Sequence, residues 1–124
     1  MAKYLTFDNL SSYKISFSLS NYVWQIVVKW KYFERNSVGL QFVRSIDSVS
    51  ANIAEGYGRF GKKDKILFYR IARGSVNESL DWLEKSKVRN LVSEGEYKSI
   101  LGKLCLLPKE INQLISFTNA KLKQ

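Results

Sequence analysis

Four stretches of the sequence place an apolar residue at every third or fourth position, and this spacing constrains the fold more than any other feature. Such steps keep side chains on one face of an α-helix, so each stretch predicts a helix with one buried side. One proline and seven glycines in 124 residues are too few turn formers for a β-sandwich or barrel. The sequence therefore predicts an all-α fold, an antiparallel up-down four-helix bundle, as a single domain over residues 1–124.

The predicted helices cover about residues 10–34, 38–56, 63–89 and 94–122. Their apolar repeats are Leu19, Val23, Ile26, Trp30 and Phe33; Phe42, Ile46, Val49 and Ile53; Ala72, Val76, Leu80 and Leu83; and Ile100, Leu104, Leu107, Ile111 and Leu114. Ser11, Ser12 or Asp8 would cap the first helix, and Ser93 with Glu96 three residues later has the pattern of a capping box.

The expected helix ends rest on glycine, polar residues and proline. Asn36, Ser37 and Gly39 are expected to separate the first two helices. Paired glycines disfavour helix continuation and offer left-handed caps, so the second helix should stop at residues 55–58. Pro108 should kink the last helix or split it in two.

The residue types that are missing exclude several classes of site. The chain has no histidine, which removes Ser-His-Asp triads, zincin motifs and the histidine ligands of di-iron bundles. The single cysteine, Cys105, excludes an intrachain disulfide and a cysteine-cluster zinc site, and its place between leucines predicts a core residue. We expect no metal site and no cofactor.

The charge balance indicates the kind of partner. Twenty basic residues stand against 11 acidic ones, a net charge of +9, which attracts polyanions. Nucleic acid is the commonest such partner, and an anionic membrane surface is the second. No apolar run of about 18 residues is present and the first eight residues lack a signal-peptide core, so we expect a cytoplasmic protein with no membrane partner.

Residues 56–63, Gly-Tyr-Gly-Arg-Phe-Gly-Lys-Lys, match the dinucleotide pattern G-x-G-x-x-G and nearly match a phosphate-binding loop. Both motifs need a strand before the loop, whereas residues 42–54 keep a helical repeat, and Lys63 replaces the hydroxyl that would hold Mg²⁺. We interpret this segment as a tight glycine corner between two antiparallel helices.

A weaker phosphate hypothesis survives around that corner. Residues 59–73 hold six basic side chains and one acidic one. The predicted nucleic-acid-binding residues are Arg59, Lys62, Lys63, Lys65, Tyr69, Arg70 and Arg73. The cations would contact phosphates near a helix N-terminus, and Tyr69, between Lys62 and Arg73 on one face, would stack on an unpaired base. The alternative is a solvated face that only keeps the protein soluble.

A polar stripe accompanies the apolar seam of the second helix. It comprises Ser45, Ser48, Asn52 and Glu55, and the third helix offers a matching patch of Ser75, Glu78 and Ser79. A hydrogen-bonded network that fixes the register of the two helices is favoured over a pair of carboxylates acting on a metal or as acid and base. Trp24, Tyr22, Tyr32 and Tyr69 exceed what one small bundle needs, which indicates self-association.

Two segments, residues 47–59 and 68–78, resemble the family of four-helix bundle proteins encoded within intervening sequences of 23S rRNA genes. The pattern S-I-x-x-N-I-A-E-G-x-G-R, a basic spacer and F-x-x-x-A-x-G-S-x-x-E is matched at its Asn, Ile-Ala-Glu-Gly, Gly-Arg, Phe, Ala, Gly-Ser and Glu positions. The matching motif residues are Asn52, Glu55, Gly56, Gly58, Gly74, Ser75 and Glu78, which we expect to build the helix corner and the internal network. Asp47, near a usually apolar position, and Pro108 depart from the pattern.

The resemblance implies a left-handed bundle that assembles into a homopentamer. Related accessory proteins of diversity-generating retroelements are basic pentamers that bind nucleic acid and a reverse transcriptase, so a protein partner of that kind is implied too. The leading hypothesis is a non-enzymatic homo-oligomer that binds RNA or DNA. The alternatives are a protein-interaction scaffold without nucleic acid, and a small hydrolase that uses Glu55, Glu78 and Mg²⁺.

Overall fold

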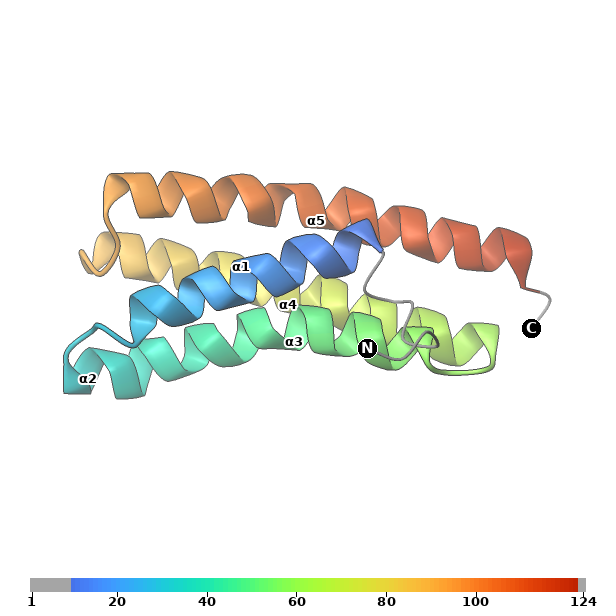
Figure 1. Ribbon diagram of the computed structural model, residues 1–124, viewed down its shortest axis with the longest axis horizontal. Helices are drawn as coiled ribbons and strands as arrows, with labels where there is room; N and C mark the ends of the chain where they lie inside the picture. Colours follow the sequence, from blue (N-terminus) through green and yellow to red (C-terminus); the bar gives the residue numbers. More distant parts are fainter. Residues whose placement is uncertain (1–9, 123–124) are drawn as a thin grey trace.

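A computed structural model describes residues 10–122 of the chain, and this part is helical apart from short turns (Figure 1). The elements are α1 (Ser11–Val27), α2 (Tyr32–Glu34), a π-helical turn η2 (Arg35–Gly39), α3 (Leu40–Tyr57), α4 (Lys62–Val88) and α5 (Glu94–Lys121). Elements α2, η2 and α3 run on without a break, so the described residues form four long helices. Within residues 10–122 no helix combines the length and the hydropathy that crossing a membrane requires.

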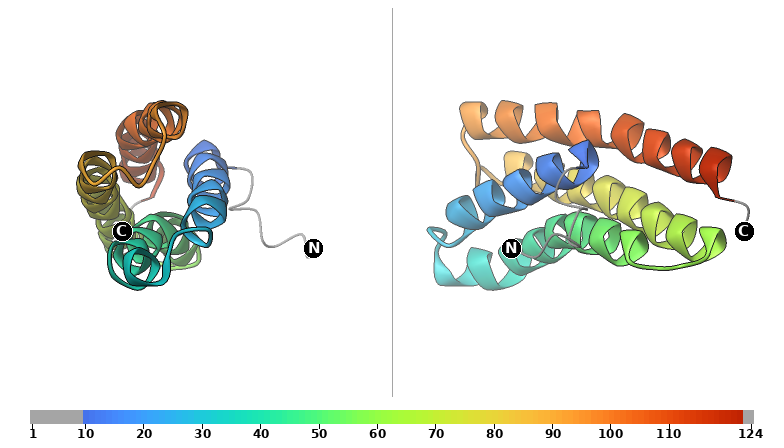
Figure 2. Two further views of the ribbon diagram at one scale, coloured as in Figure 1. Left: turned by 90° about the vertical axis from the view of Figure 1, so that its left-hand side faces the viewer. Right: turned by 45° about the vertical axis from the view of Figure 1, so that its right-hand side comes forward.

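The four long helices form an antiparallel bundle, as predicted. Neighbours in the chain lie side by side and run in opposite directions (Figures 1 and 2). Cross-helix pairs show the same direction, because Ser45 meets Ser79 while Ser48 meets Ser75. Helix α3 packs against α1 and α4, and α5 packs against α4 and α1, so the helices enclose one core.

The core consists largely of the predicted apolar faces, and Tyr69, which was predicted to lie at the surface, also belongs to it. Its fully buried side chains are Val23, Phe42, Ile46, Val49, Ile53, Tyr69, Val76, Leu83, Ile100, Leu104, Leu107 and Ile111. Leu80 and Leu114, which the spacing also assigns to the core, are only partly buried at its edge. Burial of a large apolar side chain contributes about 1.5–3 kcal/mol, so this seam dominates the stability of the bundle.

The first helix is shorter than the sequence predicts. Helix α1 ends at Val27, residues 28–31 reverse the chain, and the next helix begins at Tyr32, not near residue 38. The apolar spacing of Trp30 and Phe33 continues across this reversal by coincidence. Trp30 folds back and is partly buried, whereas Phe33 remains 75% exposed.

Asn36, Ser37 and Gly39 lie inside a helix and do not separate two helices. The side chains of Asn36 and Ser37 donate to the carbonyls of Tyr32 and Phe33, four residues back. Gly39 is buried, and a Cβ on it would lie 2.6 Å from Cγ1 of Val27. This glycine therefore serves close packing of the second helix on the end of α1.

The N-terminal caps differ between helices. Ser93 and Glu96 form the predicted capping box of α5, since each side chain accepts from the other residue's backbone N–H. Leu10 precedes α1 with no side-chain cap, so neither Ser11 nor Ser12 caps that helix. Asp8, the third candidate, lies outside the described residues.

Helix α5 continues through Pro108, so the proline does not split it. Figure 1 shows one helix that bends gently along its length. Cys105 is exposed, contrary to the expectation of a core residue. Leu104 and Leu107 take the two inward positions of that turn, and each further residue rotates by about 100°, which carries Cys105 and Leu106 outward.

Candidate nucleic-acid interface

The glycine corner is a helix end and a turn, not a nucleotide-binding loop. Helix α3 ends at Tyr57, as the sequence predicts, and α4 starts at Lys62. Gly58 follows with φ of −80°, so the predicted left-handed cap is absent from this corner. Gly56 has another role, because a Cβ there would lie 2.7 Å from the ring of Tyr69. The glycine allows α3 and α4 to approach closely.

Tyr69 is buried under this corner and cannot stack on a base. Only 1% of the residue is exposed, and burial, followed by the nearby Tyr57, raises the pKa of its hydroxyl to about 12. Lys62, Tyr69 and Arg73 do share one face of the helix, as their spacing predicts. At Tyr69 this face packs against the core. The aromatic member of the predicted binding set therefore belongs to the core.

Lys65 caps the C-terminus of α3. Its Nζ donates to the carbonyl oxygen of Tyr57 at 2.6 Å and lies 3.5 Å from that of Gly56. It also lies 5.2 Å from the centre of the Tyr57 ring. Partial burial lowers the pKa of this ammonium. Two carbonyl oxygens at the negative end of α3 bind this ammonium. Lys65 therefore stabilises the turn between α3 and α4, and its charge is less available to a phosphate.

Arg59 is paired within its own turn. Its guanidinium meets the Glu55 carboxylate at 2.8 Å and lies 4.6 Å from the centre of the Phe68 ring. Both charged side chains are about half exposed, and a pair of this kind contributes roughly 0–1 kcal/mol. The pairing neutralises one of the six predicted cations.

The remaining cations lie along α4, and two of them are on its outer side. Lys63 and Arg70 are exposed and lie seven residues apart, which places them on one face two turns apart. Lys62 is half-buried, and Arg73 donates through Nη1 to Oδ1 of Asn112 on α5 at 2.5 Å. An amide partner leaves the charge of Arg73 in place. We call Lys62, Lys63, Arg70 and Arg73 the α4 basic stripe.

Sequence reasoning missed the contribution of α5 to this surface. Asn112 meets Arg73 across 39 residues of sequence, and exposed Lys109 lies three residues before it on the same side of α5. The apolar seam of α5 fixes which of its residues face α4, but only the register between the two helices places Asn112 opposite Arg73.

The polar stripe forms a hydrogen-bonded network between α3 and α4, as predicted, and the serines carry it. Ser75 donates to Oγ of Ser48 at 2.9 Å, and Asn52 donates to the same oxygen at 2.9 Å. Ser79 lies 3.1 Å from Oγ of Ser45 in the buried part of the interface. No buried side-chain nitrogen or oxygen within residues 10–122 lacks a partner.

The two motif glutamates are not part of this network. Glu55 turns to Arg59, and Glu78 is exposed on α4. No group of three potential metal ligands occurs in the described part of the chain. Gly74, another motif residue, lies in mid-helix with open space where its Cβ would be. The corner and the network thus use Asn52, Gly56, Gly58 and Ser75, and leave Glu78 and Gly74 on the surface.

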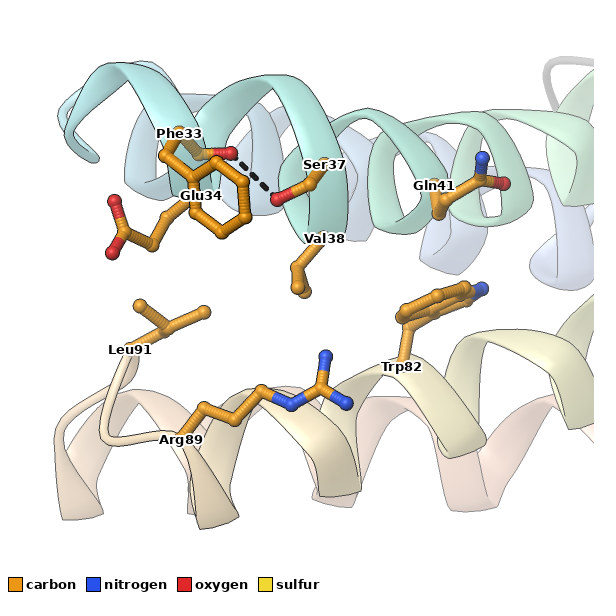
Figure 3. A pocket seen from close by; sticks show the side chains of 8 residues that line it. All are labelled: Phe33, Glu34, Ser37, Val38, Gln41, Trp82, Arg89 and Leu91. Carbon is orange, nitrogen blue, oxygen red and sulfur yellow. Dashed lines mark hydrogen bonds between the residues drawn. The ribbon is translucent and has the colours of Figure 1, made fainter.

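A second basic region, not predicted from the sequence, lies at the opposite end of the bundle. Its members are Lys29, Lys31, Arg35, Lys85, Lys87 and Arg89. They come from two segments far apart in sequence, around the α1–α2 reversal and the end of α4. A pocket of about 490 Å³ bridges these segments, with Phe33, Glu34 and Val38 on one side and Trp82, Arg89 and Leu91 on the other (Figure 3).

Comparisons with known proteins place the chain in a family. The sequence profile of the 23S rRNA-intervening sequence proteins matches residues 8–113. The chain belongs to this family. A crystal structure from Bacteroides thetaiotaomicron, described as a protein with unknown function from the S23 ribosomal protein family, has the same fold. That protein is 23% identical, with a TM-score of 0.74 over 84% of this chain and 97% of its own. No curated protein matches the chain.

Proposed function

We propose that this member of the 23S rRNA-intervening sequence family is a non-enzymatic, self-associating bundle that binds RNA or DNA through α4. The observation that carries the proposal is the α4 basic stripe. Among residues 10–122 its four cations have no acidic partner, so their charge is available to a polyanion. Contacts from lysine and arginine to phosphates supply most of the affinity of non-specific nucleic-acid binding.

The charge of the whole molecule supports the same partner. A net charge of +9 raises the encounter rate with any polyanion. The α4 basic stripe concentrates part of this charge on one helix. Lys109 extends the stripe onto α5. Arg59 and Lys65, which the sequence analysis included, contribute less because Glu55 and the end of α3 hold them.

A charge-neutralised variant tests this proposal. Changing Lys62, Lys63 and Arg70 together to glutamine should weaken binding and reduce the slope of log affinity against log salt by about 2 to 3. The matched control changes Lys14, Arg44 and Lys103 to glutamine, which removes the same charge from exposed residues of α1, α3 and α5 that have no ion-pair partner among the described residues. Equal affinity and equal slope in both variants would refute the assignment of the binding face.

Self-association is supported by apolar side chains on the outside of the bundle. Phe17 and Trp24 are 51% and 55% exposed and lie seven residues apart on one side of α1, and Val28, which caps the C-terminus of that helix four residues later, is 40% exposed. A second copy covering this face would bury them. The resemblance sets the expected number of copies at five, and a ring would multiply the α4 stripe and strengthen binding by avidity.

Sedimentation velocity on the full chain tests the assembly. A mass of five chains at micromolar concentration, reduced by Trp24→Ser, is expected. A monomeric wild-type protein would contradict the proposal. Leu106→Ser serves as the control, because this residue is 51% exposed on α5.

The proposal assigns no catalytic role to the motif glutamates. Glu55 is paired with Arg59 on α3. Glu78 is exposed on α4 and lies outside the hydrogen-bonded network between α3 and α4. A nuclease assay with Mg²⁺ should therefore show no turnover. Metal-dependent cleavage that disappears in Glu78→Gln would overturn this part.

The exposed aromatic residues favour one alternative, a protein-interaction scaffold that binds no nucleic acid. Tyr32 and Phe33 are both 75% exposed, and Phe60 is fully exposed. Exposing these apolar rings to water is unfavourable, and a binding surface would explain it. A reverse transcriptase is the kind of partner that the resemblance implies. Capture of a defined partner that survives nuclease treatment, together with no binding to RNA or DNA at low salt, would favour the scaffold.

A further inference from the structure

The pocket at the α1–α2 end of the bundle combines size with an apolar lining. Its volume of about 490 Å³ lies within the range of roughly 300–1,000 Å³ typical of ligand pockets. Phe33 and Val38 line it from the helix that begins at Tyr32, and Trp82 lines it from α4 (Figure 3). Two aromatic rings from different elements thus border one hollow, and one of them, Phe33, is 75% exposed.

The π-helical turn η2 helps to form the upper wall. Ser37, within this turn, donates its hydroxyl to the carbonyl of Phe33 at 2.5 Å, which holds the backbone that carries the exposed ring. Val38, also in the turn, is buried at the back of the pocket. Single π-helical turns inside α-helices occur often at functional sites.

The polar groups of the pocket are arranged on opposite walls. Glu34 comes from the upper helix and Arg89 from the end of α4, and neither has an ion-pair partner among the described residues (Figure 3). Gln41 adds an amide beside Trp82. An ionised carboxylate only accepts hydrogen bonds, whereas a guanidinium only donates them, so the two walls suit different parts of one ligand.

The surroundings of the pocket are basic. Lys85 lies 4.5 Å from the centre of the Trp82 ring, although Asp81 pairs with it. Lys31 is exposed two residues before Phe33, whereas the guanidinium of Arg35 lies 6.0 Å from the centre of the Tyr32 ring, outside the pocket lining. A ligand with an aromatic ring and more than one negative charge fits this combination better than a neutral or cationic one.

We propose that this pocket holds one unpaired nucleobase of a single-stranded segment, and the inference rests on the proposed nucleic-acid function. The base stacks against Trp82 and Phe33, as bases do on aromatic side chains in single-strand-binding proteins. Glu34 accepts from N–H groups on the edge of the base, and Arg89 binds a phosphate. Exposed Lys31 takes the phosphate of a neighbouring nucleotide, so a strand should bind more tightly than a free nucleotide.

The test compares an eight-nucleotide strand of deoxyadenosines with an abasic phosphodiester of the same length and charge. The full chain should bind the first roughly tenfold more tightly, because stacking adds to an identical phosphate attraction. Phe33→Ala and Trp82→Ala should each reduce this ratio toward one while leaving affinity for the abasic strand nearly unchanged. Phe117→Ala, the matched control, removes an aromatic ring that is 60% exposed near the C-terminus of α5, at the other end of the bundle, and should keep the ratio.

Several outcomes decide the proposal. Equal affinity for the two strands, or an unchanged ratio in Phe33→Ala, overturns the pocket while leaving the α4 stripe intact. The Lys62, Lys63 and Arg70 variant should bind both strands more weakly by the same factor, so the ratio of the two affinities should not change. If adenosine monophosphate binds as tightly as the strand, the pocket is a site for free nucleotides, and the proposal of a single-stranded ligand is wrong. No binding of either strand at low salt overturns the pocket. The proposed function is overturned as well only if duplex DNA and structured RNA also fail to bind under the same conditions.

Discussion

Ser79 lies with its hydroxyl 3.1 Å from Oγ of Ser45, in the buried contact between α4 and α3. Both hydroxyls also reach carbonyls of their own helices, those of Ser75 and Phe42. A small polar residue on each side lets the helices approach closely and satisfies every group that is buried there. The pair therefore fixes one register, which positions the α4 basic stripe relative to α3.

A double-mutant cycle tests that contact. Ser45→Ala and Ser79→Ala should each lower the free energy of unfolding by about 1 kcal/mol, and the two changes should couple by about 0.5–1 kcal/mol. Urea unfolding of the four proteins gives the values. Additive losses within about 0.3 kcal/mol would show that the two hydroxyls contribute independently.

Gly56 and Gly74 should respond oppositely to the same change. Gly56→Ala places a Cβ 2.7 Å from the Tyr69 ring and 3.0 Å from the carbonyl of Lys65, so a loss of about 1–3 kcal/mol is expected. Gly74→Ala meets nothing within 4 Å and should gain up to about 1 kcal/mol from helix propensity. Thermal unfolding of both variants measures the difference, and a tolerated Gly56→Ala would contradict the packing at the corner.

The buried hydroxyl of Tyr69 should appear in alkaline unfolding. Its pKa is about 12 in the folded chain and near 10 when unfolded, so the native state keeps the proton over that interval. The stability that this contributes is present below pH 10 and is lost as the pH rises toward 12. Tyr69→Phe removes the titrating group, so the wild type should lose more unfolding free energy than the variant between these pH values. Parallel losses would contradict the burial.

Asp47 should oppose folding when it is ionised. It borders a hollow lined by Phe17, Ala51 and Ala54, and desolvation raises the pKa of its carboxyl above the ordinary 3.8. The native state then binds the proton more tightly, so stability falls as the pH rises through the raised pKa. Because Asp47 is exposed, solvent screens this penalty, so Asp47→Asn should be more stable at pH 7 by at most about 0.5 kcal/mol and equal at pH 3. A loss at pH 7 would contradict this sign.

The fold was largely predictable because apolar spacing reports helix faces directly. Val49 and Leu107 are buried where their repeats place them, and Ser93 opens α5. The spacing did not reveal the reversal at residues 28–31, because Trp30 and Phe33 extend the repeat across a turn that has neither glycine nor proline. Gly39 was interpreted as a break, whereas its role is contact with Val27, which only tertiary packing reveals.

The candidate site was predictable as a set of charges but not as a geometry. The sequence identified the cations around the glycine corner, and four of them form the α4 basic stripe. It did not show that Tyr69 turns inward, that Lys65 caps α3, or that Asn112 meets Arg73. Each of these depends on the helix orientation or register set by packing against a neighbour.

Salt-resolved binding of nuclease-treated protein to single-stranded RNA, structured RNA and duplex DNA tests the central claim most directly. The account predicts binding whose affinity falls steeply between 50 and 200 mM salt, by about 10³–10⁵ for six to ten phosphate contacts on the assembled protein. It also predicts a preference for single strands and a shallower slope in the Lys62, Lys63 and Arg70 variant. No binding to any of the three at 50 mM salt would contradict the account.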